Sequence, residues 1–238
     1  MDKRMIDKLH EHLIDNLTSF YNDLNFTREF KNSSFVRDGI SIELYVNTKI
    51  GDYFTIRPGI SVSFKDVIEE INRVDEIRPL KINGHFFLDH KLANTVGVKD
   101  YDKCKENSMG SNQAYFLHKI TNYIDVEKVV RKHIEIIHSF GYSVIEKCSL
   151  EQSFYKFLEC VASGFIHNFK KYPSLPIVER PLRLTRESYL TLIWFACKED
   201  ISRAENLFEN FESIFGAESS MIKDMKLIIT DYQSLYPA

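Results

Sequence analysis

The amino-acid sequence predicts an α+β fold: an N-terminal helix on an antiparallel meander sheet, followed by a C-terminal helical half. Apolar residues recur at helical spacing near the N-terminus, alternate with polar residues from about Phe30, and return to helical spacing after Thr121. Six of the nine glycines precede residue 111, so turns gather in the first half of the chain. We therefore expect a sheet region over residues 1–121 and a helical region over residues 122–238, either as separate domains or as one continuous domain.

The first predicted helix carries an apolar stripe, which we expect to pack against one face of the sheet. Its members are Ile6, Leu9, Leu13, Leu17, Phe20 and Leu24. Residues 40–46 then alternate between apolar and polar side chains, which is typical of a half-buried strand. Asp38-Gly39 favours a tight hairpin turn to a partner strand at Phe35–Arg37, because both central residues of a type I′ turn have positive φ.

A second pair of strands is predicted on either side of Pro58-Gly59, since proline within an apolar run marks a bend, a bulge or an edge. A short helix follows near Val67, and extended segments are predicted at residues 85–92 and 114–120. The polar residues 94–112 show no period, and a loop of this length in a compact domain is usually functional or disordered.

The helical half is predicted to contain five helices. Their apolar stripes lie at residues 126–137, 154–169, 189–197, 204–215 and 222–232. Gly141 and Gly216 are predicted to end the first and fourth of these helices, and Thr185 is predicted to cap the third. Three of the six prolines fall at 173–181, which indicates a linker.

Composition and charge favour a cytoplasmic protein without a membrane partner. The formal net charge of −3 gives no global attraction to nucleic acid or to an anionic membrane. Charges run through the first eight residues, where a signal peptide needs an apolar core, and the most apolar stretch, residues 190–197, is far shorter than the ~20 residues that span a bilayer. The four cysteines lack metal-binding and redox spacings, so we expect reduced thiols, with Cys148, Cys160 and Cys197 buried or partly buried.

Metal and phosphate motifs are incomplete in the sequence, and we expect no metal and no cofactor. His10 and His12 point about 200° apart on a helix and cannot share an ion. His133 and His138 are five residues apart, where the two histidines of a helical zinc motif need four. The sequence has neither a glycine-rich phosphate loop nor a serine nucleophile elbow.

A hydrolase-like enzyme with a site on the sheet and the loop 94–112 is one alternative for the function. The candidate residues are His85, Asp89, His90, Asp100 and Asp102. Imidazole and carboxylate groups act as general acids and bases when a fold brings them within reach of a substrate. A deep pocket that collects these residues would favour the enzyme.

Charge is segregated in the helical half. Basic residues gather around the proline linker, namely Lys170, Lys171, Arg180, Arg183 and Arg186. They suit phosphate contacts and make a nucleic-acid-associated protein a second alternative, although the cluster lacks the interleaved aromatic residues of single-strand binders. After Glu199 acidic residues prevail, and Glu205, Glu209 and Glu212 fall on one side of the predicted helix at i, i+4 and i+7. Such a face can dock a basic protein partner, for example a nucleic-acid-cleaving toxin.

The order of the N-terminal helix, the Phe35-Val36-Arg37 strand, the 40–46 strand and Tyr53-Phe54-Thr55-Ile56-Arg57-Pro58-Gly59-Ile60 resembles a family of uncharacterised bacterial α+β domains. Its members share a Phe-x-Arg strand and a Phe-Thr-x-x-x-Gly-Ile strand, and some act as immunity proteins in polymorphic toxin systems. The match covers roughly the first 70 residues, and Arg57-Pro58 stands in place of the family's usual Asn-Leu. The resemblance implies an immunity or accessory role and carries over no functional residue. Our first hypothesis is therefore a non-catalytic, cytoplasmic, protein-binding protein of bacterial type.

Overall fold

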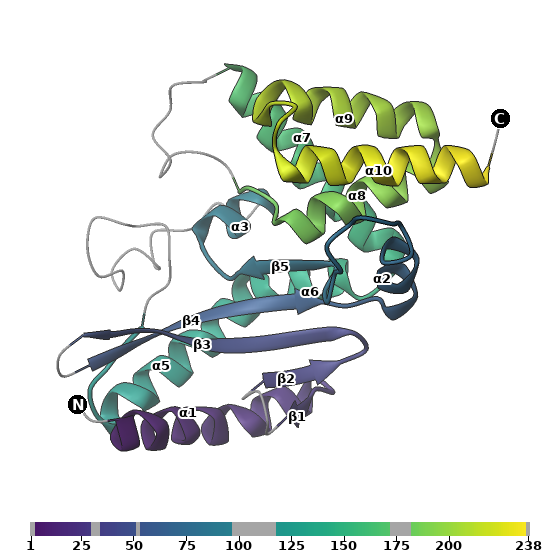
Figure 1. The fold of residues 1–238 in the computed structure, drawn as a ribbon. Coiled ribbons are helices and arrows are strands. Elements are labelled where there is room, and N and C mark those ends of the chain that lie inside the picture. The colour runs from purple at the N-terminus through teal and green to yellow at the C-terminus, as the bar shows by residue number, and fades with distance from the viewer. Residues whose placement is uncertain (1–2, 30–33, 51–52, 97–117, 172–181, 237–238) are drawn as a thin grey trace. The chain divides into compact units, whose positions relative to one another are not determined.

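The structure is a computed structural model that describes residues 3–29, 34–50, 53–96, 118–171 and 182–236 (Figure 1). The first part of the chain contains one long helix, the strands and two short helices: α1 (Lys3–Asp23), β1 (Thr27–Glu29), β2 (Ser34–Arg37), β3 (Ile40–Ile50), β4 (Tyr53–Val62), α2 (Lys65–Ile71), β5 (Gly84–Phe87), α3 (His90–Thr95) and β6 (His118–Ile120). Helices follow: α5 (Tyr123–Ile136), the π-helix η1 (Ile137–Gly141), α6 (Tyr142–Cys148), α7 (Glu151–Lys171), α8 (Arg186–Glu199), α9 (Ile201–Phe215) and α10 (Ser220–Leu235). The predicted α+β fold is confirmed. The proline linker at 173–181 lies outside the described residues, as does most of the loop at 94–112.

Six strands form one sheet in the order β1-β2-β3-β4-β5, with β6 paired to β4. Pairing is antiparallel between β1 and β2, between β2 and β3, and between β4 and β6. The β2–β3 hairpin closes where Arg37 pairs with Ile40, and φ is 45° at Asp38 and 79° at Gly39. Two consecutive positive φ values are those of the predicted tight turn, and glycine adopts such a φ without steric cost.

The chain folds into two compact units, each built from two separate stretches of the sequence. Unit 1 comprises residues 1–61 and 86–149, and unit 2 comprises residues 62–85 and 150–238. This division differs from the regions 1–121 and 122–238 that the sequence predicts. The difference arises because α5 packs against α1 and β6 in unit 1, whereas α2 packs against α8 in unit 2.

In unit 1, α1 packs against both the sheet and α5. Its buried residues are Ile6, Leu9, Leu13, Ile14, Leu17 and Tyr21. The ring of Tyr21 stacks on that of Phe35 in β2, with 4.3 Å between the ring centroids. The contact of α1 with the sheet was predicted, whereas its more extensive packing against α5 was not.

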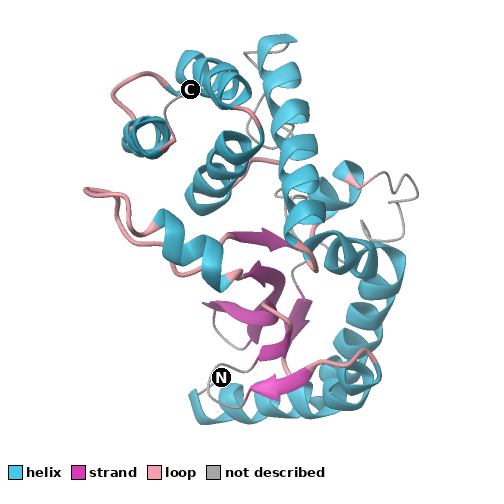
Figure 2. Cartoon of the chain, turned by 90° about the vertical axis from the view of Figure 1, so that its right-hand side faces the viewer, coloured by secondary structure: helices cyan, strands magenta, loops and turns pink. Residues whose placement is uncertain are grey.

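Gly141 does not end the helix before it, contrary to the prediction. α5 continues through η1 into α6 without a break, so these three segments form one continuous helical stretch (α5 and α6 in Figure 1; helices are cyan in Figure 2). The backbone of Gly141 is helical, with φ −58° and ψ −41°, and the residue is buried. A Cβ atom at this position would lie 2.8 Å from Cδ1 of Ile137. The glycine therefore permits close packing within the π-helical turn and does not terminate the helix.

In unit 2, the apolar stretch 190–197 forms the buried middle of α8, around which α2, α7, α9 and α10 pack. The fully buried Asn83 ties the segment after α2 to this helix. Its Nδ2 donates a hydrogen bond to Oγ1 of Thr191 at 3.3 Å, and its Oδ1 accepts one from the backbone N–H of Phe64 at 2.6 Å. Buried amide groups are stable when they are paired in this way.

Cys148 and Cys197 are buried free thiols, as predicted, whereas Cys160 is exposed. The prediction for Cys160 was wrong. Successive helical residues advance by about 100°, and Cys160 falls well away from the buried stripe of α7 that includes Phe154 and Leu158. Cys104 lies outside the described residues. Among the helices that the structure describes, none combines the length and apolar character needed to cross a bilayer.

Candidate functional site

A pocket of about 380 Å³ opens in unit 2 between α7 and α8. α7 lines it with Glu151, Gln152 and Tyr155, and α8 lines it with Trp194, Phe195, Lys198 and Glu199. Each set follows the helical period, in which residues three or four apart share a face. The first turns of α7 therefore meet the last turns of α8 at the pocket.

Three aromatic rings form the apolar wall of the pocket. The ring centroid of Phe195 lies 5.5 Å from that of Tyr155 and 5.1 Å from that of Trp194. Both distances fall in the favourable range for aromatic pairs. Tyr155 and Trp194 are buried, whereas Phe195 is only half-buried. The middle ring therefore keeps part of its surface accessible.

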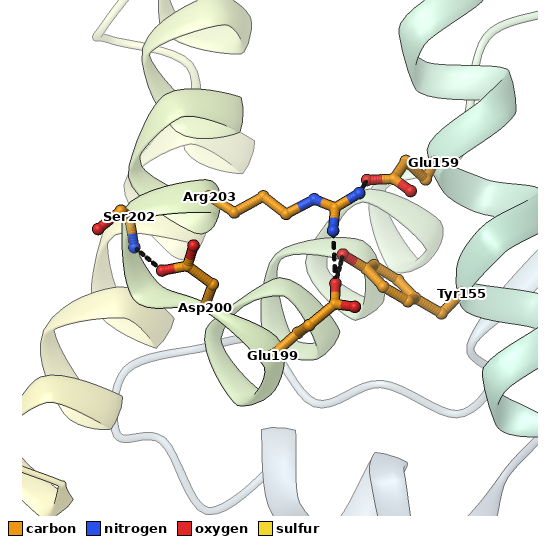
Figure 3. Close-up of polar contacts among 6 residues, drawn as sticks. All are labelled: Tyr155, Glu159, Glu199, Asp200, Ser202 and Arg203. Atoms are coloured by element: carbon orange, nitrogen blue, oxygen red, sulfur yellow. Dashed lines mark hydrogen bonds and ion pairs between the residues drawn. The ribbon is translucent and has the colours of Figure 1, made fainter.

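Glu199 is the last residue of α8 and lines the pocket with its carboxylate. Its contacts with Tyr155 and Arg203 are drawn in Figure 3. Its Oε2 accepts a hydrogen bond from the Tyr155 hydroxyl at 2.9 Å and another from Nη1 of Arg203 at 2.7 Å. Nη2 of Arg203 forms an ion pair with Glu159 of α7. A carboxylate at a helix C-terminus is disfavoured by the helix dipole. The two donors offset this cost and hold the carboxylate in one position.

The short joint between α8 and α9 explains why Glu199 and Arg203 meet. Asp200 is the joint, with an extended backbone at φ −162° and ψ 116°. Its Oδ1 accepts a hydrogen bond from the backbone N–H of Ser202 at 2.9 Å, so that Asp200 caps the start of α9 (Figure 3). Because one residue separates the two helices, the end of α8 lies beside the first turn of α9.

The donors that hold Glu199 keep their protons at neutral pH. Burial raises the pKa of the Tyr155 phenol, and the hydrogen bond to Glu199 raises it further. Desolvation alone would lower the pKa of Arg203, but Tyr155 and the carboxylates of Glu159 and Glu199 outweigh it and raise that pKa. Tyr155 and Arg203 therefore position a carboxylate and do not exchange protons with a ligand near neutral pH.

The remaining polar groups of the pocket differ in how they are paired. Nζ of Lys198 lies 4.2 Å from the ring centroid of Trp194 and 3.5 Å from Oε2 of Glu70. Glu151 and Gln152 have no side-chain hydrogen bond and no ion pair with any residue that the structure describes. Glu151 also stands in the first turn of α7, where the helix dipole favours a carboxylate.

The predicted carboxylates Glu205, Glu209 and Glu212 lie on α9, and we call them the α9 acidic strip. The first two are exposed and the third is half-buried. Oε1 of Glu205 accepts a hydrogen bond from Nε2 of Gln233 at 2.9 Å. Within the described ranges, no cationic side chain pairs with any of the three.

Of the five residues predicted for an enzyme site, two have described side chains. His85 is half-buried in β5, in unit 2. Asp89 is buried in unit 1, where its Oδ1 accepts hydrogen bonds from the backbone N–H groups of Lys91 and Leu92, both at 3.0 Å. Asp89 thus caps α3, and the extended segment predicted at 85–92 ends at Phe87. The side chain of His90 lies outside the described part of the structure, as do Asp100 and Asp102.

No three His, Cys, Asp or Glu side chains gather as a metal site requires within the residues that the structure describes. Comparisons of the chain with protein-family models, curated proteins and solved structures found no match. The candidate site therefore stands on its own geometry.

Tyr155, Trp194 and Glu199 were not among the predicted site residues. Tyr155 and Trp194 fall in helical segments whose apolar stripes indicate a core, and Glu199 falls in a long acidic tail of the sequence. One local signal was available for Trp194 alone: Trp194 and Lys198 are four residues apart, and pairs at this spacing meet on one helix face.

Proposed function

We propose that the chain is a non-catalytic cytoplasmic protein of bacterial type that binds a basic protein partner through the α9 acidic strip. The observation that carries the proposal is the presence of three carboxylates on one side of one helix, without a cationic partner among the described residues. The sequence resemblance to a family that includes immunity proteins supports a basic toxin as the partner.

The positions of these carboxylates are electrostatically unfavourable for an isolated helix. α9 has no acidic residue in its first turn, where the helix dipole would favour one, and Glu212 stands in its last turn, where the dipole disfavours it. Glu205 and Glu209 repel each other at i, i+4 spacing, which costs about 0.2–0.5 kcal/mol. Helix stability therefore does not account for the strip, which supports a role in binding.

A basic partner would gain both attraction and orientation from the strip. Exposed charges of this kind act mainly on the association rate, because they steer the partner during its approach. Salt weakens the effect, since the Debye length is only ~8 Å at physiological ionic strength. The cation of α9 itself does not neutralise the strip, because Arg203 is engaged by Glu159 and Glu199.

The test begins with capture of the partner. The tagged chain is used to isolate its partner from the native host, and mass spectrometry identifies it. Association rates are then measured for the wild type and for a variant with Glu205→Lys, Glu209→Lys and Glu212→Lys, at low and at physiological salt. We expect the variant to associate severalfold more slowly at low salt, with a smaller difference at physiological salt.

A matched variant separates the effect of the α9 acidic strip on the association rate from the effect of net charge. Glu69→Lys, Asp75→Lys and Glu218→Lys change the same number of carboxylates, all of them exposed, elsewhere in unit 2. We expect this control to associate nearly as fast as the wild type. Equal slowing of both variants would attribute the effect to net charge alone, and unchanged rates for the strip variant at both salt concentrations would refute the proposal.

A further inference from the structure

We propose that the pocket between α7 and α8 is a receptor for the guanidinium group of an arginine side chain on the basic protein partner. The inference rests on the proposed function for the nature of the partner. It rests on the pocket itself for the chemistry of the ligand group.

The pocket offers hydrogen-bond acceptors that the described protein does not use. Oε2 of Glu199 accepts both hydrogen bonds that reach this carboxylate from Tyr155 and Arg203, and Oε1 accepts none from a described residue. The carboxylate of Glu151 is likewise without a described donor. Two carboxylates on opposite helices, one of them fixed in position, suit a ligand that carries several donors.

The charges that surround the pocket favour a cation. Four carboxylates lie in or next to it, from Glu70, Glu151, Glu159 and Glu199, whereas two cations face them. Lys198 is engaged by Glu70 and by the ring of Trp194, and Arg203 is engaged by Glu159 and Glu199. The resident cations are therefore already paired, and the pocket retains a negative balance that an incoming cation would neutralise.

The aromatic wall selects a planar cation. Guanidinium groups stack on aromatic faces and present five N–H donors in a rigid fork, whereas an ammonium group is a compact, strongly hydrated point charge. Phe195 keeps part of its ring accessible between Tyr155 and Trp194. A guanidinium stacked on this ring could reach carboxylates of both α7 and α8. The volume of about 380 Å³ lies near the lower end of known ligand pockets, which suits one long side chain and its neighbours.

The chain contains its own reporter for this site. Trp194 is the only tryptophan of the sequence and it lines the pocket. Its fluorescence is therefore titrated with the blocked tripeptide acetyl-Gly-Arg-Gly-amide at constant ionic strength, and with the same peptide carrying citrulline in place of arginine. Citrulline keeps the shape of the side chain and removes its charge. We expect a saturable change in emission with the arginine peptide and none with the citrulline peptide.

Variants of the full-length chain assign the response to the pocket. Glu199→Gln and Glu151→Gln should each weaken binding of the arginine peptide by about tenfold or more, because each removes a charged hydrogen-bond acceptor. Glu218→Gln changes an exposed carboxylate that pairs with Lys223 and does not line the pocket, and it should leave the affinity unchanged. Circular dichroism of each variant checks that the helices are retained.

Three outcomes of the tripeptide titrations overturn the inference. They are the lack of a saturable response to the arginine peptide, an equal response to the citrulline peptide, and affinities that neither Glu199→Gln nor Glu151→Gln changes. A fourth outcome also refutes it. Tighter binding of free L-arginine than of the blocked tripeptide would show that the pocket is a site for the free amino acid and not for an arginine side chain of a protein partner. Each result is independent of the association rates measured for the α9 acidic strip, so the pocket can fail while the proposed function holds, and the reverse.

Discussion

The hydroxyl of Tyr21 and Nε2 of His133 lie 2.5 Å apart in the core of unit 1, although 112 residues separate them in the sequence. Both side chains are buried, with at most 1% of either exposed. The contact joins α1 to α5, and the stacking of Tyr21 on Phe35 extends it to β2. A buried polar pair of this kind specifies how the elements dock, because either group alone would be costly to bury.

Removal of the Tyr21 hydroxyl should destabilise the protein. Tyr21→Phe keeps the ring and its stacking but takes the hydrogen-bond partner away from the buried Nε2 of His133. We expect the free energy of unfolding to fall by about 1–3 kcal/mol in urea denaturation. Tyr123→Phe, at an exposed position of the same unit, should change it by less than about 0.5 kcal/mol. Equal effects of the two substitutions would show that the Tyr21–His133 contact contributes no stability.

The buried leucines of α1 should be equally sensitive. Leu13 and Leu17 have no exposed surface, so truncation to alanine leaves a cavity between α1 and its neighbours. We expect Leu13→Ala and Leu17→Ala each to lower the free energy of unfolding by about 2–5 kcal/mol. Met5→Ala, on the exposed side of the same helix, serves as the control. Losses below about 1 kcal/mol for both leucines would mean that the stripe is not part of the core.

Asp89 should make stability depend on pH. Burial raises the pKa of Asp89 from 3.8 to about 6, against the hydrogen bonds from Leu92 and Lys91 and the charge of Arg57, which lower it. The folded chain thus holds this proton more tightly than the unfolded chain. The stabilisation is fully present below pH 3.8 and is lost as the pH rises through about 6. The full loss corresponds to about 3 kcal/mol.

The substitution Asp89→Asn isolates this dependence, because asparagine also caps helices and does not titrate. Unfolding of both proteins is measured in urea from about pH 4 to about pH 7, and the difference between them cancels the other titrating groups. We expect the wild type to lose stability relative to the variant across this range. A difference that stays constant with pH would contradict a raised pKa for Asp89.

Thiol labelling should distinguish the exposed Cys160 from the buried cysteines. Burial raises the pKa of Cys197 to about 12 and raises that of Cys148 further, so both thiols stay protonated and shielded. We expect Cys160→Ser to remove one fast-reacting equivalent under native conditions. Cys148→Ser and Cys197→Ser should leave the fast phase unchanged. Fast labelling that survives in Cys160→Ser at its full amplitude would place Cys160 in the core after all.

Asn83 should be a sensitive position in unit 2. Asn83→Ala would leave the backbone N–H of Phe64 and the hydroxyl of Thr191 without their described partner. We expect a loss of about 1–3 kcal/mol in the free energy of unfolding. Lys81→Ala, two residues earlier and exposed, should cost less than about 0.5 kcal/mol. If the two variants unfold alike, the Asn83 hydrogen bonds do not stabilise unit 2.

Features that depend on near neighbours in the sequence were predictable. Thr185 caps α8 by accepting a hydrogen bond from the backbone N–H of Ser188, and Gly216 ends α9 with φ 81°. The Asp38-Gly39 turn has its two positive φ values. The side on which Glu205, Glu209 and Glu212 lie follows from the helical period alone. The exposure of Cys160 follows from the same period. Its prediction failed because the general tendency of cysteine to be buried was given more weight than the position of Cys160 around the helix.

The pocket could not be predicted in this way. Tyr155 and Glu199 are 44 residues apart, and their hydrogen bond exists only because α7 and α8 pack with their opposite ends together. Arg203 and Glu159 are equally distant in the sequence. No local pattern marks such a pair, since the side chains become neighbours only when the helices dock.

By itself the sequence determined the fold class, the positions of most helices and strands, and several caps and turns, because these follow from the period of apolar residues and from backbone preferences over a few positions. It did not determine all of them: the helix continues through Gly141, and the pair of strands predicted on either side of Pro58-Gly59 is the single strand β4. The tertiary structure alone decided which polar groups are buried, such as His133 and Asn83, and that α5 to α6 join unit 1 while α2 joins unit 2. The physical reason is that these outcomes depend on contacts between residues far apart in the chain. Their free energies are set by how whole faces fit together and not by any local pattern.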